Sequence, residues 1–222
     1  MEKKRKFKYA IFDKDGVLTD SMGQNYKVFD AAAREFLGQV FTKSDFFRRF
    51  IGVPWREILK PYFKNDEQYQ KFADAFHERL VPAIKYAPLF PLVKEVLDYL
   101  KNDAGFDLFV SSSAPQPAMD DFLAREGLGK YFKLGRGRGE RHVNKREHMR
   151  EFAQVSGLSM DDFAAEAFII EDMVHGIEAA KELGLFAIGL ETSLTAPELK
   201  AAGADVVLPN HAALLEYLKE NL

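Results

Sequence analysis

The amino-acid sequence predicts an α/β protein, a Rossmann-like doubly wound parallel sheet with an inserted helical domain. Over residues 88–222, short apolar runs alternate with amphipathic helical segments, which is typical of buried parallel strands covered by helices on both faces. Residues 22–87 contain several segments of helical spacing and no run typical of a buried strand. We therefore expect a core domain of residues 1–21 and 88–222, interrupted by a helical domain of residues 22–87.

The first apolar run, Tyr9 to Phe12, is expected to be a buried strand. It ends in two carboxylates, Asp13 and Asp15, with Gly16 just after them. Charges of the same sign at this separation repel by roughly a few kcal/mol at an intermediate dielectric. A cation is therefore expected beside the pair. The helical insert follows, and its helical segments are VFDAAAREFL, KSDFFRRFI, WREILKPYF and EQYQKFADAFHERL.

The second half of the chain is expected to supply the rest of the sheet. A helix over residues 91–101 leads into the strand FDLFVSS (106–112), and a helix over 117–126 follows. The remaining expected elements are the strands EAFIIE (166–171), LFAIGL (185–190) and ADVVL (204–208), the helical GIEAAKELG and a closing helix over 211–222. Ligands bind beyond the carboxyl ends of strands in such sheets. The polar residues expected to converge there are Asp13 and Asp15, Ser112 and Ser113, and Glu171 and Asp172.

The composition excludes several classes of function. A net charge of −3 over 222 residues gives no reason to expect nucleic-acid binding. The absence of cysteine excludes disulfides, thiolate metal sites and a cysteine nucleophile, and it suits a reducing cytoplasm. The basic start MEKKRKFKYA lacks the apolar segment of a signal peptide, and no run is long enough to span a membrane. A cytoplasmic protein without nucleic-acid or membrane partners is expected.

The stretch FDKDGVLTDS, residues 12–21, resembles the first motif of the haloacid dehalogenase superfamily of phosphohydrolases. Counterparts of the other three motifs follow in the family's order, and the insert resembles the helical caps of β-phosphoglucomutase-like members. The resemblance covers most of the chain. It implies a Mg²⁺-dependent phosphatase that acts on a small phosphorylated metabolite, as a monomer or homodimer. Residues 22–87 would then be a cap domain that closes over the site and reads the leaving group.

The resemblance implies roles for the two leading carboxylates. Asp13 would be the nucleophile that forms an aspartyl-phosphate, which splits a slow hydrolysis into two steps. Asp15 would protonate the leaving alcohol and then take a proton from water. Repulsion by Asp13 favours a proton on Asp15 and a nearby cation opposes it, so the balance stays open. An acid at this position also argues against dehalogenase chemistry.

The fourth motif, IIEDMVHGIEAAKELG, supplies a further acid. In the family, the metal is held by the first aspartate, the backbone carbonyl of the second and an acid of this motif. Those positions are Asp13, Asp15 and Asp172, with Glu171 as an additional candidate. Oxygen ligands of this kind suit Mg²⁺, which would offset the repulsion between the leading carboxylates. The alternatives are a helix N-cap for Asp172 and a solvated charge for Glu171.

Two further motifs supply groups for a phosphate. Ser112 matches the second motif, where a hydroxyl donates to the phosphoryl group, and the backbone amide of Ser113 would help. Ser111 would take this place if the strand ended one residue earlier. Lys145, in VNKREHMREFA, matches the third-motif lysine. Arg141 is the alternative, because Arg146 follows Lys145 where the family often has proline.

The glycine-arginine stretch LGRGRGERHVNK, residues 134–145, fits neither the Walker nor the dinucleotide-binding pattern. A solvated flexible loop is expected here. The alternative is that the arginines attract a second anionic group of the substrate; these are Arg136, Arg138 and Arg141.

The insert contains the candidates for substrate specificity. Trp55 and Arg56 lie where related caps present side chains to the substrate, and Asn25 stands where mutases of this type carry a histidine. Asparagine cannot do the same proton work, so a phosphatase is preferred over a β-phosphoglucomutase-like mutase. A non-catalytic binding protein on the same scaffold is the third alternative. It is disfavoured because every motif keeps its reactive residue.

Overall fold

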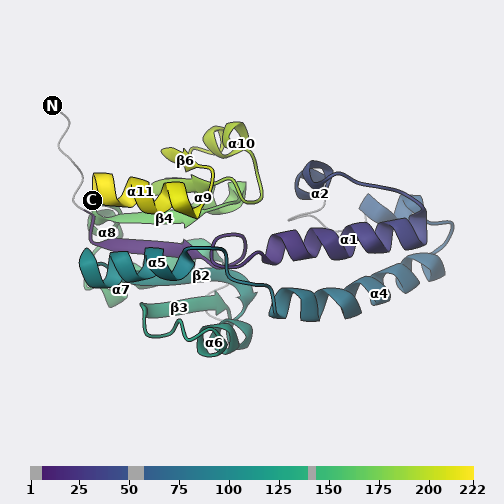
Figure 1. Cartoon of the computed structure of the whole chain (residues 1–222), viewed down its shortest axis with the longest axis horizontal. Coiled ribbons are helices and arrows are strands. Elements are labelled where there is room, and N and C mark those ends of the chain that lie inside the picture. Colours follow the sequence, from purple (N-terminus) through teal and green to yellow (C-terminus); the bar gives the residue numbers. More distant parts are fainter. Residues whose placement is uncertain (1–6, 50–57, 140–143) are drawn as a thin grey trace. The chain divides into compact units, whose positions relative to one another are not determined.

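The computed structural model describes residues 7–49, 58–139 and 144–222, and the chain divides into two compact units (Figure 1). The first, called the α/β unit, comprises Met1–Thr19 and Leu89–Leu222. The second, called the helical unit, comprises Asp20–Pro88. The predicted fold class, a doubly wound parallel sheet with a helical insert, is confirmed.

The sheet of the α/β unit has six strands in the order β3-β2-β1-β4-β5-β6, and every neighbouring pair is parallel. The strands are β1 (Tyr9–Asp13), β2 (Asp107–Pro115), β3 (Phe132–Arg138), β4 (Ala167–Glu171), β5 (Phe186–Leu190) and β6 (Val206–Leu208). Beyond β1 the next strands are β2 and β3, and beyond β4, on the other side, they are β5 and β6. A crevice forms at such a reversal, beyond the carboxyl ends of the two strands. Asp13 ends β1 and Glu171 ends β4, so both lie at this point.

Helices cover both faces of the sheet, and Figure 1 shows α5 and α11 in front of it. Successive strand residues face opposite sides, which divides the core in two. Phe12 and Val110 belong to a buried cluster with residues of α5, α6 and α11. Phe109 faces the other way and stacks on Phe152 of α7, with ring centroids 4.7 Å apart. The helices are α5 (Val93–Asp98), α6 (Gln116–Arg125), α7 (Lys145–Val155), α8 (Met160–Glu166), α9 (Val174–Glu182), α10 (Ala196–Ala201) and α11 (His211–Asn221), with a π-helical turn η2 (Tyr99–Asp103).

The helical unit is built on two long helices packed side by side (Figure 1). They are α1 (Ser21–Leu37) and α4 (Asp66–Lys85), accompanied by α2 (Lys43–Arg49) and the short 3₁₀ helix η1 (Lys60–Tyr62). Phe29 of α1 is fully buried, and its ring lies 5.0 Å from Phe46 and 5.4 Å from Phe41 between centroids. Aromatic side chains bury a large area each, which helps a unit of this size to form a core.

None of the helices in the described parts of the chain combines the length and apolar character needed to cross a bilayer.

The expectation of a solvated loop at residues 134–138 is wrong, because they belong to the edge strand β3. The glycines of this strand are closely packed: a Cβ at Gly135 would lie 2.7 Å from Leu123 Cδ1, at the end of a side chain. A Cβ at Gly137 would lie 2.7 Å from the carbonyl oxygen of Ala114. The alternation of glycine and arginine lacks the apolar residues that mark a strand, so the sequence pattern did not reveal it.

Gly176 of α9 gives a test of packing against helix propensity. Alanine would favour a helix by up to about 1 kcal/mol over glycine. A Cβ at Gly176, however, would lie 2.2 Å from Cδ of Glu171, a buried side chain that is held by other contacts. We expect Gly176→Ala to destabilise the protein by about 1–3 kcal/mol, as overpacking does. Thermal unfolding followed by circular dichroism measures this.

The matched control is Gly129→Ala, because a Cβ at Gly129 meets nothing within 4 Å and its backbone is not left-handed. This variant should unfold at or above the midpoint of the unmodified protein. A Gly176→Ala variant as stable as Gly129→Ala would contradict the packing argument.

Candidate active site

Three buried carboxylates form a cluster at the carboxyl ends of β1 and β4. Asp13, Glu171 and Asp172 each offer an oxygen, and these atoms lie within 4.8 Å of one another. All three residues are buried. Asp13 and Glu171 come together because β1 and β4 are neighbours in parallel register, and Asp172 directly follows Glu171. The expected convergence of these acids is therefore present in the structure.

Lys145 lies among these carboxylates. Its Nζ is 2.8 Å from Asp13 Oδ1 and 2.6 Å from Glu171 Oε2. The residue begins α7, whose N-cap is Asn144, and the Asn144 side chain accepts a hydrogen bond from the backbone N–H of Glu147. Burial alone would lower the pKa of Lys145, but the charges of Asp13 and Glu171 raise it above its usual value. Lys145 is therefore a permanent cation in the cluster.

One ammonium does not balance three carboxylates. Burial raises the pKa of Asp13 to about 7, and the charge of Glu171 adds to this effect, while Lys145 opposes it. The pKa of Asp172 is raised well above its usual value. Burial is the largest cause, and repulsion from the charges of Glu171 and Asp13 adds to it. A buried site with this excess of negative charge favours either bound protons or an additional cation.

The oxygens of Asp172 and Glu171 are used differently. Oδ1 of Asp172 is buried and has no hydrogen-bond partner among the described residues, while Oδ2 accepts a hydrogen bond from the Ser193 hydroxyl. In Glu171, Oε2 is bound by Lys145, and Oε1 accepts from the backbone N–H of Met173 at 3.3 Å. A buried acceptor without a partner is costly, and a divalent cation would satisfy it. The donor set therefore fits Mg²⁺, with Asp172 better placed than Glu171 to bind it directly.

The alternative role of Asp172, as a helix N-cap, is wrong. The N-cap residue of α9 is Met173, and no side chain caps this helix. The other alternative, Glu171 as a solvated charge, is also wrong, because Glu171 is fully buried.

Asp15 accepts contacts on both carboxylate oxygens. Lys14 Nζ lies 2.5 Å from Oδ1, and the Ser112 hydroxyl donates to Oδ2 at 3.0 Å. Lys14 is buried, and its ammonium lies 5.2 Å from the ring centroid of Phe122. Sequence reasoning missed this role of Lys14; its position between two acids was the only available signal.

Strand alternation separates the three consecutive serines of β2. Ser111 has the parity of Phe109 and faces α7, where its hydroxyl lies 2.8 Å from Nδ1 of His148. Ser112 faces the opposite side of the sheet and contacts Asp15. Ser113 is exposed. Of the three side chains, the structure brings only that of Ser112 to the leading carboxylates.

Two arginine candidates of the α/β unit, Arg136 and Arg138, make no contact with this cluster within the described residues. Arg136 donates two hydrogen bonds to the carboxylate of Glu151, one from Nε and one from Nη2, each at 2.6 Å. Arg138 is exposed on β3. Asn25 belongs to α1 of the helical unit, and its buried Oδ1 has no hydrogen-bond partner in the described residues. The candidates that lie outside the described residues are Trp55, Arg56 and Arg141.

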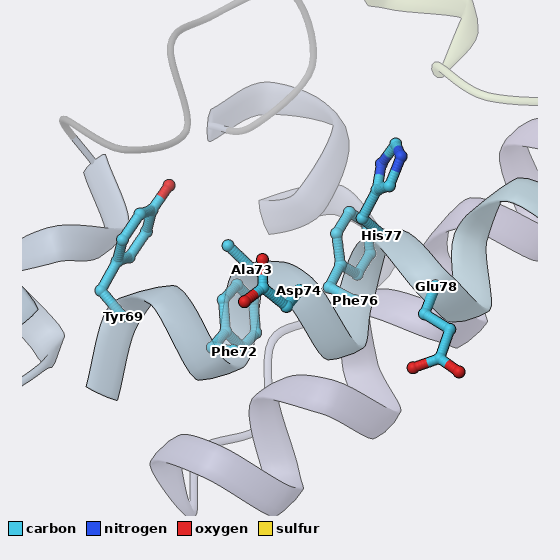
Figure 2. A pocket seen from close by; sticks show the side chains of 7 residues that line it. All are labelled: Tyr69, Phe72, Ala73, Asp74, Phe76, His77 and Glu78. Carbon is cyan, nitrogen blue, oxygen red and sulfur yellow. The ribbon is translucent and has the colours of Figure 1, made fainter. Parts of the chain in front are cut away.

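A pocket of about 480 Å³ lies along α4 of the helical unit (Figure 2). Its lining residues are Tyr69, Phe72, Ala73, Asp74, Phe76, His77 and Glu78. Figure 2 shows Tyr69 and His77 toward the two ends of this row. The acidic cluster of Asp13, Glu171 and Asp172 belongs to the α/β unit, and none of its residues lines this pocket.

Sequence reasoning also missed the loop after β5. The Thr192 hydroxyl donates to the carbonyl of Gly16 at 2.6 Å, and the Ser193 hydroxyl donates to Asp172. No motif marks these residues. The available signal was a pair of hydroxyl residues just beyond a strand of the same sheet, where ligand-binding loops gather.

Comparison with known proteins identifies the family. Residues 10–190 match the family model "Haloacid dehalogenase-like hydrolase". "Probable phosphatase IndB" from Dickeya dadantii is 28% identical over 212 residues, which cover 90% of this chain and 88% of that protein. Phosphoglycolate phosphatase from Synechococcus elongatus is 24% identical over 209 residues, which cover 93% of this chain and 94% of that protein.

Among solved structures, a HAD family hydrolase from Deinococcus radiodurans with bound phosphate and sodium has the same fold. The TM-score is 0.78 at 24% identity, over 98% of this chain and 97% of that one. The family model covers most of the chain, and its hydrolase class agrees with the buried acidic cluster. The chain therefore belongs to the haloacid dehalogenase-like hydrolases.

Proposed function

We propose that this hydrolase is a Mg²⁺-dependent phosphatase that cleaves a small phosphorylated metabolite through an aspartyl-phosphate on Asp13. The observation that carries the proposal is the buried cluster of Asp13, Glu171 and Asp172, in which Lys145 is the one basic side chain that forms ion pairs within the described residues. The phosphatase names of the similar curated proteins support the reaction class. The cytoplasm is the proposed location.

In the first step, a carboxylate oxygen of Asp13 attacks the phosphorus atom and the bond from phosphorus to the ester oxygen breaks. The leaving oxygen takes a proton from Asp15 and departs as an alcohol. Lys145 contacts Asp13 at 2.8 Å, so its ammonium holds the nucleophile in one orientation. It also lies close enough to attract a phosphoryl oxygen.

In the second step, Asp15 removes a proton from water, and the oxygen of this water attacks phosphorus. The bond between Asp13 and phosphorus breaks, which releases phosphate and restores the carboxylate. Both oxygens of Asp15 accept a hydrogen bond in the structure, one from Lys14 and one from Ser112. Ser112 is one of these donors, and it is also proposed to donate to the phosphoryl group, together with the amide of Ser113. An entering phosphate would therefore free Asp15 by taking over the Ser112 hydroxyl.

The proposed Mg²⁺ ligands are Asp13, the backbone carbonyl of Asp15 and Asp172. The buried Oδ1 of Asp172, which has no partner among the described residues, supports this assignment. When bound, the ion supplies positive charge that offsets the repulsion between the carboxylates and the incoming phosphate. Glu171 is proposed to act through Lys145, whose Nζ lies 2.6 Å from its Oε2.

The helical insert, residues 22–87, is proposed as a cap that excludes water and selects the substrate. Asn25, Trp55 and Arg56 are its proposed specificity residues. A sugar-phosphate mutase is the second candidate function, and it is disfavoured because Asn25 has no titratable ring. A bisphosphorylated sugar that primes turnover of a sugar monophosphate would favour the mutase.

Replacement of the nucleophile tests the proposed function directly. Asp13→Asn should lower turnover of an aryl phosphate by at least about 10⁴-fold, as loss of a nucleophile does in other enzymes. The variant should unfold no earlier than the unmodified protein when metal is absent, because it removes a charge that burial and Glu171 disfavour. Release of nitrophenol and thermal unfolding measure the two effects. The matched control is Asp103→Asn, at an exposed aspartate, which should keep full activity. Retained turnover in Asp13→Asn would refute the assignment of Asp13 as the nucleophile.

The proton role of Asp15 predicts a dependence on the leaving group. Asp15→Asn should slow hydrolysis of an alkyl phosphate by about 10²–10⁴-fold, the usual range for loss of a general acid or base. Formation of the phosphoenzyme from nitrophenyl phosphate should suffer less, because nitrophenolate leaves without a proton. Rapid-quench measurement of the first step with both substrates checks this. Equal losses with the two leaving groups would argue against proton donation by Asp15.

The cluster predicts competition between Mg²⁺ and protons. Since the pKa of Asp13 is about 7 in the metal-free protein, a proton occupies the cluster below that pH and must leave when the ion binds. The apparent affinity for Mg²⁺ should therefore fall as pH drops below 7, by about tenfold per pH unit for each proton displaced. Calorimetric titration at several pH values measures this. EDTA should abolish activity until Mg²⁺ is restored, and activity that persists after thorough chelation would exclude the metal.

A further inference from the structure

The loop that leaves β5 reaches the proposed metal site from outside the four motifs. Ser193, three residues beyond the end of β5, donates its hydroxyl hydrogen to Oδ2 of Asp172. Asp172 follows β4, the neighbour of β5 in the sheet. The loop thus contacts the acid proposed as a direct ligand, although it contributes no acid to the cluster of Asp13, Glu171 and Asp172.

A second segment, the loop after β1, also packs closely against this carboxylate. The backbone of Gly16 has a φ of +90° and passes so close that a Cβ there would lie 1.8 Å from Oδ2 of Asp172. The Thr192 hydroxyl donates to the carbonyl oxygen of Gly16 at 2.6 Å. Adjacent residues of one loop therefore hold Asp172 directly and hold the Gly16 backbone that packs against it.

This arrangement treats the two oxygens of Asp172 unequally. Oδ2 has the Ser193 hydroxyl and the close backbone of Gly16, so rotation of the carboxylate is restricted. Oδ1 stays buried and has no hydrogen-bond partner in the described residues. Groups that orient a ligand without touching the metal are known to tune metal affinity.

We propose that Ser193 is a positioning residue for Asp172, and that its hydroxyl sets the affinity of the site for Mg²⁺. The inference rests on the proposed function, because it assumes that Asp172 binds the ion. Thr192 has a supporting role, since its hydroxyl fixes the Gly16 backbone, which also approaches Oδ2 of Asp172. The loop after β5 is thereby a part of the metal site that supplies no ligand.

Calorimetric titration of metal-free protein with Mg²⁺ tests this. Ser193→Ala should weaken Mg²⁺ binding by about tenfold or more, the usual effect of losing an orienting partner. Ser193→Thr keeps a hydroxyl and should restore most of the affinity. The Mg²⁺ concentration for half-maximal phosphatase activity should rise in parallel in Ser193→Ala, whereas turnover at saturating Mg²⁺ should fall much less.

Ser156→Ala is the matched control, because the buried Ser156 hydroxyl has no hydrogen-bond partner in the described structure and lies on no strand end. It should bind Mg²⁺ as the unmodified protein does. If the unmodified protein binds Mg²⁺ and Asp172→Asn does not, but Ser193→Ala binds equally well, the positioning role alone is overturned. If the unmodified protein itself fails to bind Mg²⁺, the proposed metal dependence is overturned, and this inference with it.

Discussion

The contacts of Lys145 with Asp13 and Glu171 are the interaction on which the site depends. They join the start of α7 to the ends of β1 and β4, and they make it possible to bury acids that would otherwise repel one another. Removing Lys145 would be far more costly than removing a surface lysine, because the buried carboxylates would be left uncompensated. Lys145 compensates only part of the charge, and the pKa of Asp13 stays near 7. The incomplete balance suits a site that takes up a cation.

Residues that are adjacent in the chain have different contact partners at this site. In β2, Ser111 and Ser112 face opposite sides of the sheet, so one hydroxyl contacts His148 and the other contacts Asp15. At the end of β4, Glu171 is tied to Lys145, whereas Asp172 is held by Ser193 and keeps one oxygen without a partner in the described residues. The two serines differ because successive side chains of a strand alternate in direction. The two acids differ because Asp172 lies beyond the end of β4, where the loop after β5 reaches it.

Glycine has a specific role where backbone and side chains approach closely. Gly16 allows the loop after β1 to pass beside Asp172, and Gly176 allows α9 to lie against Glu171. Both acids owe their positions to the absence of a Cβ on a neighbouring segment. The helical unit has a different organisation, with an aromatic core around Phe29.

The sequence by itself determined the fold class and most strands, because apolar runs and helical spacing are local properties. It also determined the family, because the motifs are short runs of consecutive residues. It also indicated Asp13, Asp15, Ser112 and Asp172 as a group, since each follows a strand of a parallel sheet. Only the tertiary structure showed that residues 134–138 form a strand, that Arg136 is occupied by Glu151, and that Lys14 and Ser193 contact the acids. Such contacts depend on the register of neighbouring strands and on the paths of loops. Those are set by packing of the whole unit, and no local pattern in the chain records them.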